Sequence, residues 1–254
     1  MRFQGRIALI SAAGRGIGRA VAEIIGREGG TVVAVDNDKD ALESVVGAVR
    51  AAGGTAHGLP ADALDAAQAD DVVRRTADAH GRIDILVNAV GGSTIIGKPA
   101  ATVEDLTLAE WQQLLHFNLT GTFLFTHAVV PIMKRQRAGK IVNISSIAGR
   151  GRSATSSSAY ATAKGGIIAF TKKLSLELGP FGINVNAIAP SLTLSPRLKP
   201  RWDKMTAQEQ QQEVERVPLR RVAEPVDQAR VICFLASSDA DFVTGITIDV
   251  TGGS

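Results

Sequence analysis

The sequence contains little cysteine and histidine, the residues that form disulfides and many metal sites. Its 254 residues include one cysteine, Cys233, so no internal disulfide can form and a reducing compartment is expected. Cys233 lies in the apolar run 231–235, where we expect buried packing rather than a nucleophile. The four histidines are scattered without ligand spacing, so no metal site is expected: His57, His80, His116 and His127.

Long apolar runs and a strong charge of one sign are also missing. No segment approaches the ~18 uninterrupted apolar residues of a membrane span, and residues 1–6 lack the apolar core of a signal peptide. Lysine and arginine number 28 against 25 acidic residues, a net charge of +3. This excess is too small to indicate a nucleic-acid partner. We therefore expect a cytoplasmic protein that binds neither membranes nor nucleic acid.

Short β-branched runs alternate with helical stretches along the whole chain. Strands are expected at 7–10, 31–35, 55–59, 83–87, 141–144, 184–188 and 246–250. Most are apolar throughout, which is typical of parallel strands covered on both faces. Helices are expected at 16–28, 40–51, 66–80, 109–135, 157–178 and 225–236. The pattern predicts an α/β fold with a doubly wound, parallel, seven-stranded sheet and helices on both faces.

Residues 1–254 are expected to form a single domain, because no repeat, low-complexity tract or long linker divides them. The serine-rich piece 153–158 is expected to be a loop, with Ser157 or Ser158 capping the following helix. Residues 191–217 are the least regular region. Their prolines and their position before the last expected helix indicate a surface flap over a ligand.

A glycine-rich turn follows the first expected strand. It reads Ser-Ala-Ala-Gly-Arg-Gly-Ile-Gly over residues 11–18, and a helix comes next. Glycines let the backbone approach a phosphate closely, and the helix N-terminus supplies free N–H groups and a positive dipole end. Arg19 breaks the strict G-x-G-x-x-G pattern, and a lone turn of this kind is often only a tight turn. Its position in a βαβ unit favours a nucleotide site.

Asp36 ends the second expected strand and bears on the kind of nucleotide. A carboxylate there can accept hydrogen bonds from both hydroxyls of the adenosine ribose and repels a 2′-phosphate. The nearest basic residue is Lys39. The position therefore favours NAD over NADP. The alternative is that Asp36 only begins the turn at 36–38 or caps a helix.

Two further loops follow expected strands on the same side. Asp62 and Ala63 follow the third strand, and Asn88 opens the segment 88–92 after the fourth. In an open parallel sheet, ligands bind outside the carboxyl ends of the strands. We therefore expect these loops at the same edge of the sheet as the glycine turn.

Tyr160 and Lys164 are the strongest candidates for chemistry. They are four residues apart on an expected helix and so share one face. A phenol has a pKa of about 10, and a neighbouring cation favours the phenolate. Ser146 could hold a substrate oxygen against this phenol, while Ser145 should point to the other side of its strand. Such a site can move a proton on or off an alcohol or carbonyl oxygen. For the pair alone, the alternative is an exposed polar pair on a helix.

Taken together, these residues resemble the short-chain dehydrogenase/reductase family over essentially the whole chain. Residues 11–18 are similar to T-G-x-x-x-G-x-G, residues 88–91 to N-N-A-G, and Tyr160 with Lys164 to Y-x-x-x-K. Asn118 resembles the asparagine of the central helix, and Ser146 the catalytic serine. Residues 184–190 resemble the segment before the nicotinamide-contacting loop, and 244–253 the C-terminal end.

The resemblance implies a Rossmann-like fold, a homotetramer, and hydride transfer between nicotinamide and a secondary alcohol or ketone. Tyr160 would exchange the proton, Lys164 would lower the tyrosine pKa and hold the nicotinamide ribose, and Ser146 would position the substrate oxygen. Asn118 would hold a water that links Lys164 to solvent. The implied cofactor contacts are Gly14, Arg15, Gly16, Ile17, Gly18, Asp36, Asp62, Ala63, Asn88, Tyr160, Lys164 and Thr193.

Three departures from the family pattern concern the cofactor and the active-site loop. Ala12 replaces the first motif glycine and would cost ~1–2 kcal/mol if the position needs a positive φ. Ser191 stands where glycine is usual. The spacing from Ser146 to Tyr160 is one residue longer than the commonest one, which lengthens a loop. We expect cofactor binding to survive these changes.

The basic residues near the expected site suggest the hypothesis of an anionic alcohol, sugar or cis-diol as substrate. Arginine suits a bidentate grip on an anion, and the candidates are Arg150, Arg152, Arg197 and Arg201. The alternative is a solvated basic surface. The pocket wall is expected to include Thr94, Ile95 and Ile96.

Two other functions stay open. The first is an NADPH-dependent 3-oxoacyl (carrier-protein) ketoreductase, against which Asp36 argues. The second is a non-catalytic NAD-binding sensor, which would be expected to lack part of the Asn118, Ser146, Tyr160 and Lys164 set.

Overall fold

Seven parallel strands form one sheet at the centre of the fold, with the order β3-β2-β1-β4-β5-β6-β7. The computed structural model describes all 254 residues. The strands are β1 Ile7–Ser11, β2 Thr31–Asp36, β3 Thr55–Pro60, β4 Ile85–Asn88, β5 Gly139–Ile144, β6 Ile183–Pro190 and β7 Thr247–Val250. This arrangement confirms the predicted doubly wound sheet. The strand order reverses between β1 and β4, which are neighbours in the sheet.

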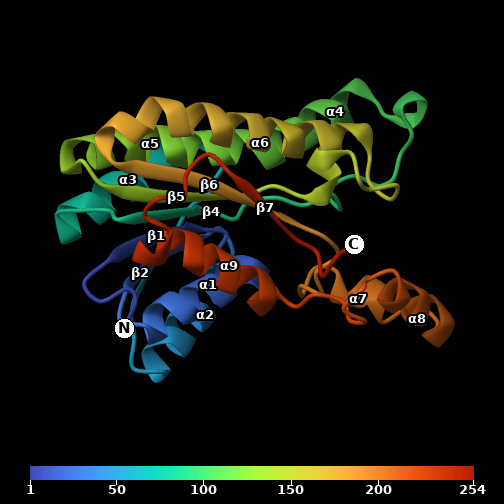
Figure 1. Ribbon diagram of the computed structural model, residues 1–254, viewed down its shortest axis with the longest axis horizontal. Helices are drawn as coiled ribbons and strands as arrows, with labels where there is room; N and C mark the ends of the chain where they lie inside the picture. Colours follow the sequence, from blue (N-terminus) through green and yellow to red (C-terminus); the bar gives the residue numbers. More distant parts are fainter.

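Helices cover both faces of this sheet (Figure 1). One layer contains α1 (Gly16–Arg27), α2 (Lys39–Ala51) and α9 (Pro225–Ala236). The opposite layer contains α3 (Ala66–His80), α5 (Gly121–Gln136) and α6 (Ser158–Leu178), with α4 (Leu108–Leu115) against one end of α6. No helix combines the length and apolar character that a membrane crossing requires.

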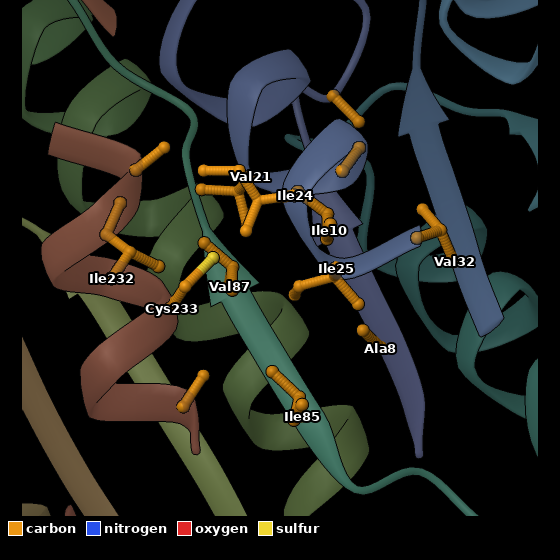
Figure 2. Close-up of a cluster of buried hydrophobic side chains, with 14 of the residues drawn as sticks. Ala8, Ile10, Val21, Ile24, Ile25, Val32, Ile85, Val87, Ile232 and Cys233 are labelled. Atoms are coloured by element: carbon orange, nitrogen blue, oxygen red, sulfur yellow. The ribbon is translucent and has the colours of Figure 1, made fainter. Parts of the chain in front are cut away.

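The two helical layers pack on alternate residues of the central strands, which point to opposite faces of the sheet. Ala8 and Ile10 of β1 pack in the core cluster under α1, α2 and α9, whereas Leu9 packs in the cluster under α3, α5 and α6. Figure 2 shows the first cluster, with side chains of α1 and α9 meeting over β1 and β4. Burial of each aliphatic side chain of this kind stabilises the folded state by about 1.5–3 kcal/mol. Cys233 belongs to this cluster, and burial raises the pKa of its thiol to about 12, so the expected packing role is confirmed.

The expected apolar strands are buried only in the middle of the sheet. The central strands β1, β4 and β5 are almost wholly buried. The edge strand β3 and the opposite edge strand β7 are largely exposed or half-buried, because each has a neighbour on one side only. Strand ends otherwise agree with the sequence to within two residues.

One prediction of local structure was wrong and another was incomplete. The single helix expected at 109–135 is divided into α4 and α5 by the π-helical turn His116–Thr120. The region 191–217, expected to be the least regular of the chain, contains two short helices, α7 (Lys199–Trp202) and α8 (Ala207–Glu215), on the side of the C-terminus (Figure 1). A capping box between Thr206 and Glu209 starts α8. Because α8 packs no face into the core, it needs no apolar stripe, and its sequence therefore lacks the pattern that would signal a helix.

Candidate active site

One cavity of about 540 Å³ follows the carboxyl ends of the strands. Its wall passes from the turn after β1, past the ends of β2 and β3, to the loops after β4, β5 and β6. This is where doubly wound sheets hold ligands. The predicted residues that line it are Arg15, Gly16, Ile17, Gly18, Asp36, Asp62, Ala63, Ser146, Tyr160, Lys164 and Thr193.

The N-terminus of α1 opens into this cavity without a side-chain cap. Its N-cap residue, Arg15, makes no capping hydrogen bond, whereas Asp38, Asp65 and Ser157 cap α2, α3 and α6. The first N–H groups of α1 are therefore left for a ligand, and the helix dipole favours an anion there. Gly16 has φ +57°, and a Cβ atom on Gly18 would collide with the Ala12 carbonyl. This cradle fits the pyrophosphate of a dinucleotide.

Ala12 itself has φ +50°, in the left-handed region that favours glycine. A positive φ is the condition under which alanine is costly at this position. The condition is met, so the turn carries about 1–2 kcal/mol of backbone strain.

The end of the cavity beside β2 is acidic. Asp36 accepts hydrogen bonds from the backbone N–H groups of Gly14 (2.9 Å) and Asp38 (3.0 Å), so it does organise the turn at 36–38. A carboxylate has about four lone-pair sites, which leaves room for ribose hydroxyls as well. Arg15 is held by Asp38 at 2.6 Å, and Lys39 is exposed and does not line the cavity.

Two predicted cofactor residues do not reach the cavity wall. Gly14 packs against α2, where a Cβ atom would lie 2.8 Å from the Cβ of Ala41. The Asn88 side chain is buried and donates to Asn143 Oδ1 (2.9 Å) and Thr126 Oγ1 (3.0 Å). Gly14 thus shapes the turn beside Asp36, and the Asn88 amide links β4 to β5 and α5.

Ser146, Tyr160 and Lys164 meet at the opposite end of the cavity. Ser157 caps α6 by accepting from the Tyr160 N–H, as one of the two predicted caps. Lys164 is buried, and its Nζ donates to the Ile144 carbonyl at 2.8 Å. Ser145 donates its hydroxyl to the Lys164 carbonyl at 2.7 Å, whereas Ser146 is the serine that interacts with the phenol.

The charges at this end differ from the sequence expectation. Burial lowers the pKa of Lys164 to about 7, and the nearby charge of Arg197 lowers it as well. Burial raises the pKa of Tyr160, which its interaction with Ser146 and the charge of Arg197 only partly oppose. The expected lowering of the Tyr160 pKa by Lys164 is therefore not found, because burial dominates over neighbouring charge.

Asn118 lies in the π-helical turn and is fully buried. Its Oδ1 accepts from the Gly92 N–H at 2.8 Å, and its Nδ2 donates to the carbonyls of Gly92 (3.1 Å) and Leu114 (3.0 Å). A Cβ atom on Gly91 would lie 2.6 Å from Lys164 Nζ and 2.9 Å from Asn118 Oδ1. Glycine at 91 thus lets both side chains approach the loop after β4. Asn118 fixes that loop at the edge of the cavity.

Only one of the four candidate arginines lines the cavity. Arg150 and Arg152 both pair with Asp249, at 3.1 and 3.3 Å, and neither lines the cavity. Arg201 is exposed on α7 and also lies outside the cavity wall. Arg197 lines the cavity.

The predicted pocket wall is correct in one residue of three. Thr94 lines the cavity, whereas Ile96 is buried with Leu114 and Ala159, and Ile95 packs against them. Tyr160 packs on this small cluster, so the isoleucines support the tyrosine from behind.

Sequence reasoning missed Gln228, a fully buried amide on α9. Its Nε2 donates to Thr193 Oγ1 (3.2 Å) and to the Val250 carbonyl (3.1 Å), while its Oε1 has no partner. It holds Thr193 at the cavity wall. The sequence signal for it was a glutamine within the apolar face of the last helix.

No group of three or more His, Cys, Asp or Glu side chains gathers in a way that could hold a metal ion.

Comparison with known proteins gives matches over nearly the whole chain. A family model described as Enoyl-(Acyl carrier protein) reductase matches residues 11–254. The (2S)-[(R)-hydroxy(phenyl)methyl]succinyl-CoA dehydrogenase subunit BbsD of Thauera aromatica is 38% identical over 253 residues, which cover 100% of this chain and 98% of that protein.

Solved structures agree with this result. The crystal structure of levodione reductase superposes with a TM-score of 0.92 at 32% identity, covering 99% of this chain and 98% of that chain. A 3-oxoacyl-[acyl-carrier protein] reductase from Brucella melitensis with bound NAD gives a TM-score of 0.87 at 34% identity, covering 99% and 93%.

Proposed function

Because this chain belongs to the short-chain dehydrogenase/reductase family, we propose that it uses NAD to interconvert a secondary alcohol and a ketone. Membership makes it an oxidoreductase that acts on CH–OH groups. The observation that carries the finer proposal is a single cavity with Ser146, Tyr160 and Lys164 at one end and two aspartates at the other.

The acidic end supports NAD over NADP. Asp36 and Asp38 both line the cavity, and Asp38 holds Arg15, the one basic residue of the turn. A 2′-phosphate would meet two carboxylates there and no free cation, whereas ribose hydroxyls would find acceptors. The N-terminus of α1 and the glycines at 16 and 18 would hold the pyrophosphate, and Thr193 the nicotinamide end.

The reaction end supports proton transfer at a substrate oxygen. A bound nicotinamide would accept or supply the hydride. Ser146 would hold the substrate oxygen beside the Tyr160 hydroxyl, which would take the alcohol proton in oxidation and return it in reduction. Lys164, with its pKa of about 7, is poised to change its charge near neutral pH and so to assist that proton exchange. Asn118 keeps the loop at 91–92 in place around Lys164.

The first test is titration of the protein with NADH and NADPH, followed by fluorescence or calorimetry, and then turnover on a panel of secondary alcohols and ketones. We expect NADH to bind at least ten-fold more tightly. Tighter NADPH binding would refute the proposed role of Asp36 and favour the ketoreductase alternative. Binding of NADH with no turnover over a wide panel would favour the sensor alternative.

We also propose a homotetramer. Phe123 on α5 and Leu176 on α6 are exposed apolar residues on the outer face of one layer, and Phe242 before β7 is fully exposed. Such side chains are suited to burial against other subunits. Light scattering behind size exclusion checks the mass, and a monomer near 26.6 kDa would refute the proposal. The cytoplasmic location stays a prediction from the sequence.

A further inference from the structure

Arg197 belongs to the flap region 191–217, yet it reaches the reaction end of the cavity. Its Nη1 donates to the Gly91 carbonyl at 2.8 Å, and its guanidinium carbon lies 5.8 Å from the centroid of the Phe117 ring. A Cβ atom on Gly92 would collide with Nη1. The absence of a side chain at 92 therefore makes the space that the guanidinium occupies.

No carboxylate neutralises this guanidinium. Arg150 and Arg152, by contrast, share Asp249, and Lys199 pairs with Asp203. Arg197 makes no ion pair, and its one hydrogen bond to a backbone carbonyl uses one of five N–H donors. It is also exposed to the cavity rather than covered by protein. A ligand can therefore reach the free donors.

The guanidinium lies close enough to the reacting groups for its charge to act on them. It lowers the pKa of both Tyr160 and Lys164. Two cations, Lys164 and Arg197, thus share this end of the cavity, while the acidic residues of the cavity wall lie after β2 and β3. An incoming anion would relieve the repulsion between these cations, and a neutral alcohol would not.

We propose that Arg197 binds a carboxylate of the substrate, so that the enzyme acts on hydroxy acids and their oxo acids. This proposal rests on the proposed function. The planar fork of arginine matches a carboxylate with two parallel hydrogen bonds. Ser146 and Tyr160 hold the reacting oxygen, and Arg197 fixes the other end of a short substrate. Arg150, Arg152 and Arg201 take no part.

The dead-end complex of the protein with NAD⁺ and an oxo acid allows binding of the acid to be measured without turnover. The NAD⁺-saturated protein cannot reduce an oxo acid, so binding is measured at equilibrium by calorimetry. The probes are 3-oxobutanoate, 3-oxohexanoate and 3-oxo-3-phenylpropanoate, each compared with its methyl ester. We expect at least one acid to bind about ten- to a hundred-fold more tightly than its ester, as a charge-assisted hydrogen-bonded pair allows.

Variants assign this preference to one residue. Arg197→Gln should abolish the difference between acid and ester, Arg197→Lys should retain part of it, and the matched control Arg201→Gln should leave it unchanged. Two results would overturn the proposal: esters that bind as tightly as acids throughout, or an Arg197→Gln variant that weakens acid and ester equally. The second result would show that Arg197 only ties residues 191–217 to the loop after β4. Failure of NAD⁺ itself to bind would instead refute the proposed cofactor, and the series would then be run with NADP⁺.

Discussion

The two ends of the cavity are built by different means. At the glycine turn, the N-terminus of α1 opens into the cavity, and Asp36 and Asp38 beside it accept hydrogen bonds from backbone N–H groups. At the reaction end, side chains line the cavity, and the cations among them, Lys164 and Arg197, have backbone carbonyls rather than carboxylates as partners. The first end is fixed before any ligand arrives, whereas the second keeps charges whose balance depends on what binds.

Substitutions at the two ends should therefore have different effects. Changes at the acidic end should alter which cofactor binds and leave the chemistry intact. Changes at the cationic end should alter rate, substrate choice and pH dependence and leave cofactor affinity nearly intact.

Tyr160→Phe should break the reaction end alone. Removing the hydroxyl removes the group that exchanges a proton with the substrate oxygen, so kcat should fall by about 10²–10⁴-fold. NADH affinity should change little, because the phenol ring and its packing on Ile96 and Leu114 stay. Steady-state rates and an NADH titration of the same sample check this. A variant that keeps a tenth of the rate would show that another group carries the proton.

Asp36→Asn should break the acidic end alone. The charge that repels a 2′-phosphate is lost while a hydrogen-bond acceptor is kept, so the preference for NADH over NADPH should shrink by about ten- to a hundred-fold. Asp38→Asn should add to this by releasing Arg15 from its 2.6 Å ion pair. Binding titrations with both cofactors measure the ratio. An unchanged ratio in the double variant would mean that neither aspartate faces the ribose.

Lys164 should make the stability of the cofactor-free protein rise with pH. Burial lowers its pKa from 10.5 to about 7, so between these values the unfolded chain binds a proton that the folded protein does not. The free energy of unfolding should therefore rise across this window, by up to about 1.4 kcal/mol per pH unit. Below pH 7 both states are protonated and the full cost of the buried charge remains.

Lys164→Met should remove that rise, while the exposed control Lys173→Met should keep it. Denaturant unfolding at pH 7 and 8.5, at one protein concentration, gives the two slopes. Equal slopes for the wild type and Lys164→Met would show that the buried amine keeps an ordinary pKa.

The smallest effect is expected at Ala12. Glycine at this φ of +50° relieves strain, so Ala12→Gly should stabilise the protein by about 0.5–1 kcal/mol. The neighbouring control Ala13→Gly has no positive φ to relieve and should destabilise it instead. Thermal unfolding of the two variants decides the sign. A loss of stability in Ala12→Gly would mean that the alanine is not strained.

The sequence predicted the sheet well because its central strands are continuous apolar runs with helices of ordinary length between them. It could not predict the break at Asn118, since the polar and apolar pattern continues through 109–135. It could not separate Arg197 from Arg150 and Arg152 either. That distinction depends on Asp249, about a hundred residues further along the chain, which only the folded sheet brings near. The motifs also could not show that Gly14 and Asn88 lie behind the cavity wall, because that depends on how α2 and β5 pack against them.

The π-helical turn at His116–Thr120 has a consequence for the helices on either side of it. A π turn closes from residue i to i+5, so it contains one residue more than the α-helical path would. One residue corresponds to a rotation of about 100°. The turn therefore sets the phase between Leu114 of α4 and the buried face of α5 formed by Phe125, Val129 and Met133. A regular α-helix through the same residues would rotate that buried face by about 100° relative to Leu114, so the π turn is what allows both to be buried although one extra residue separates them.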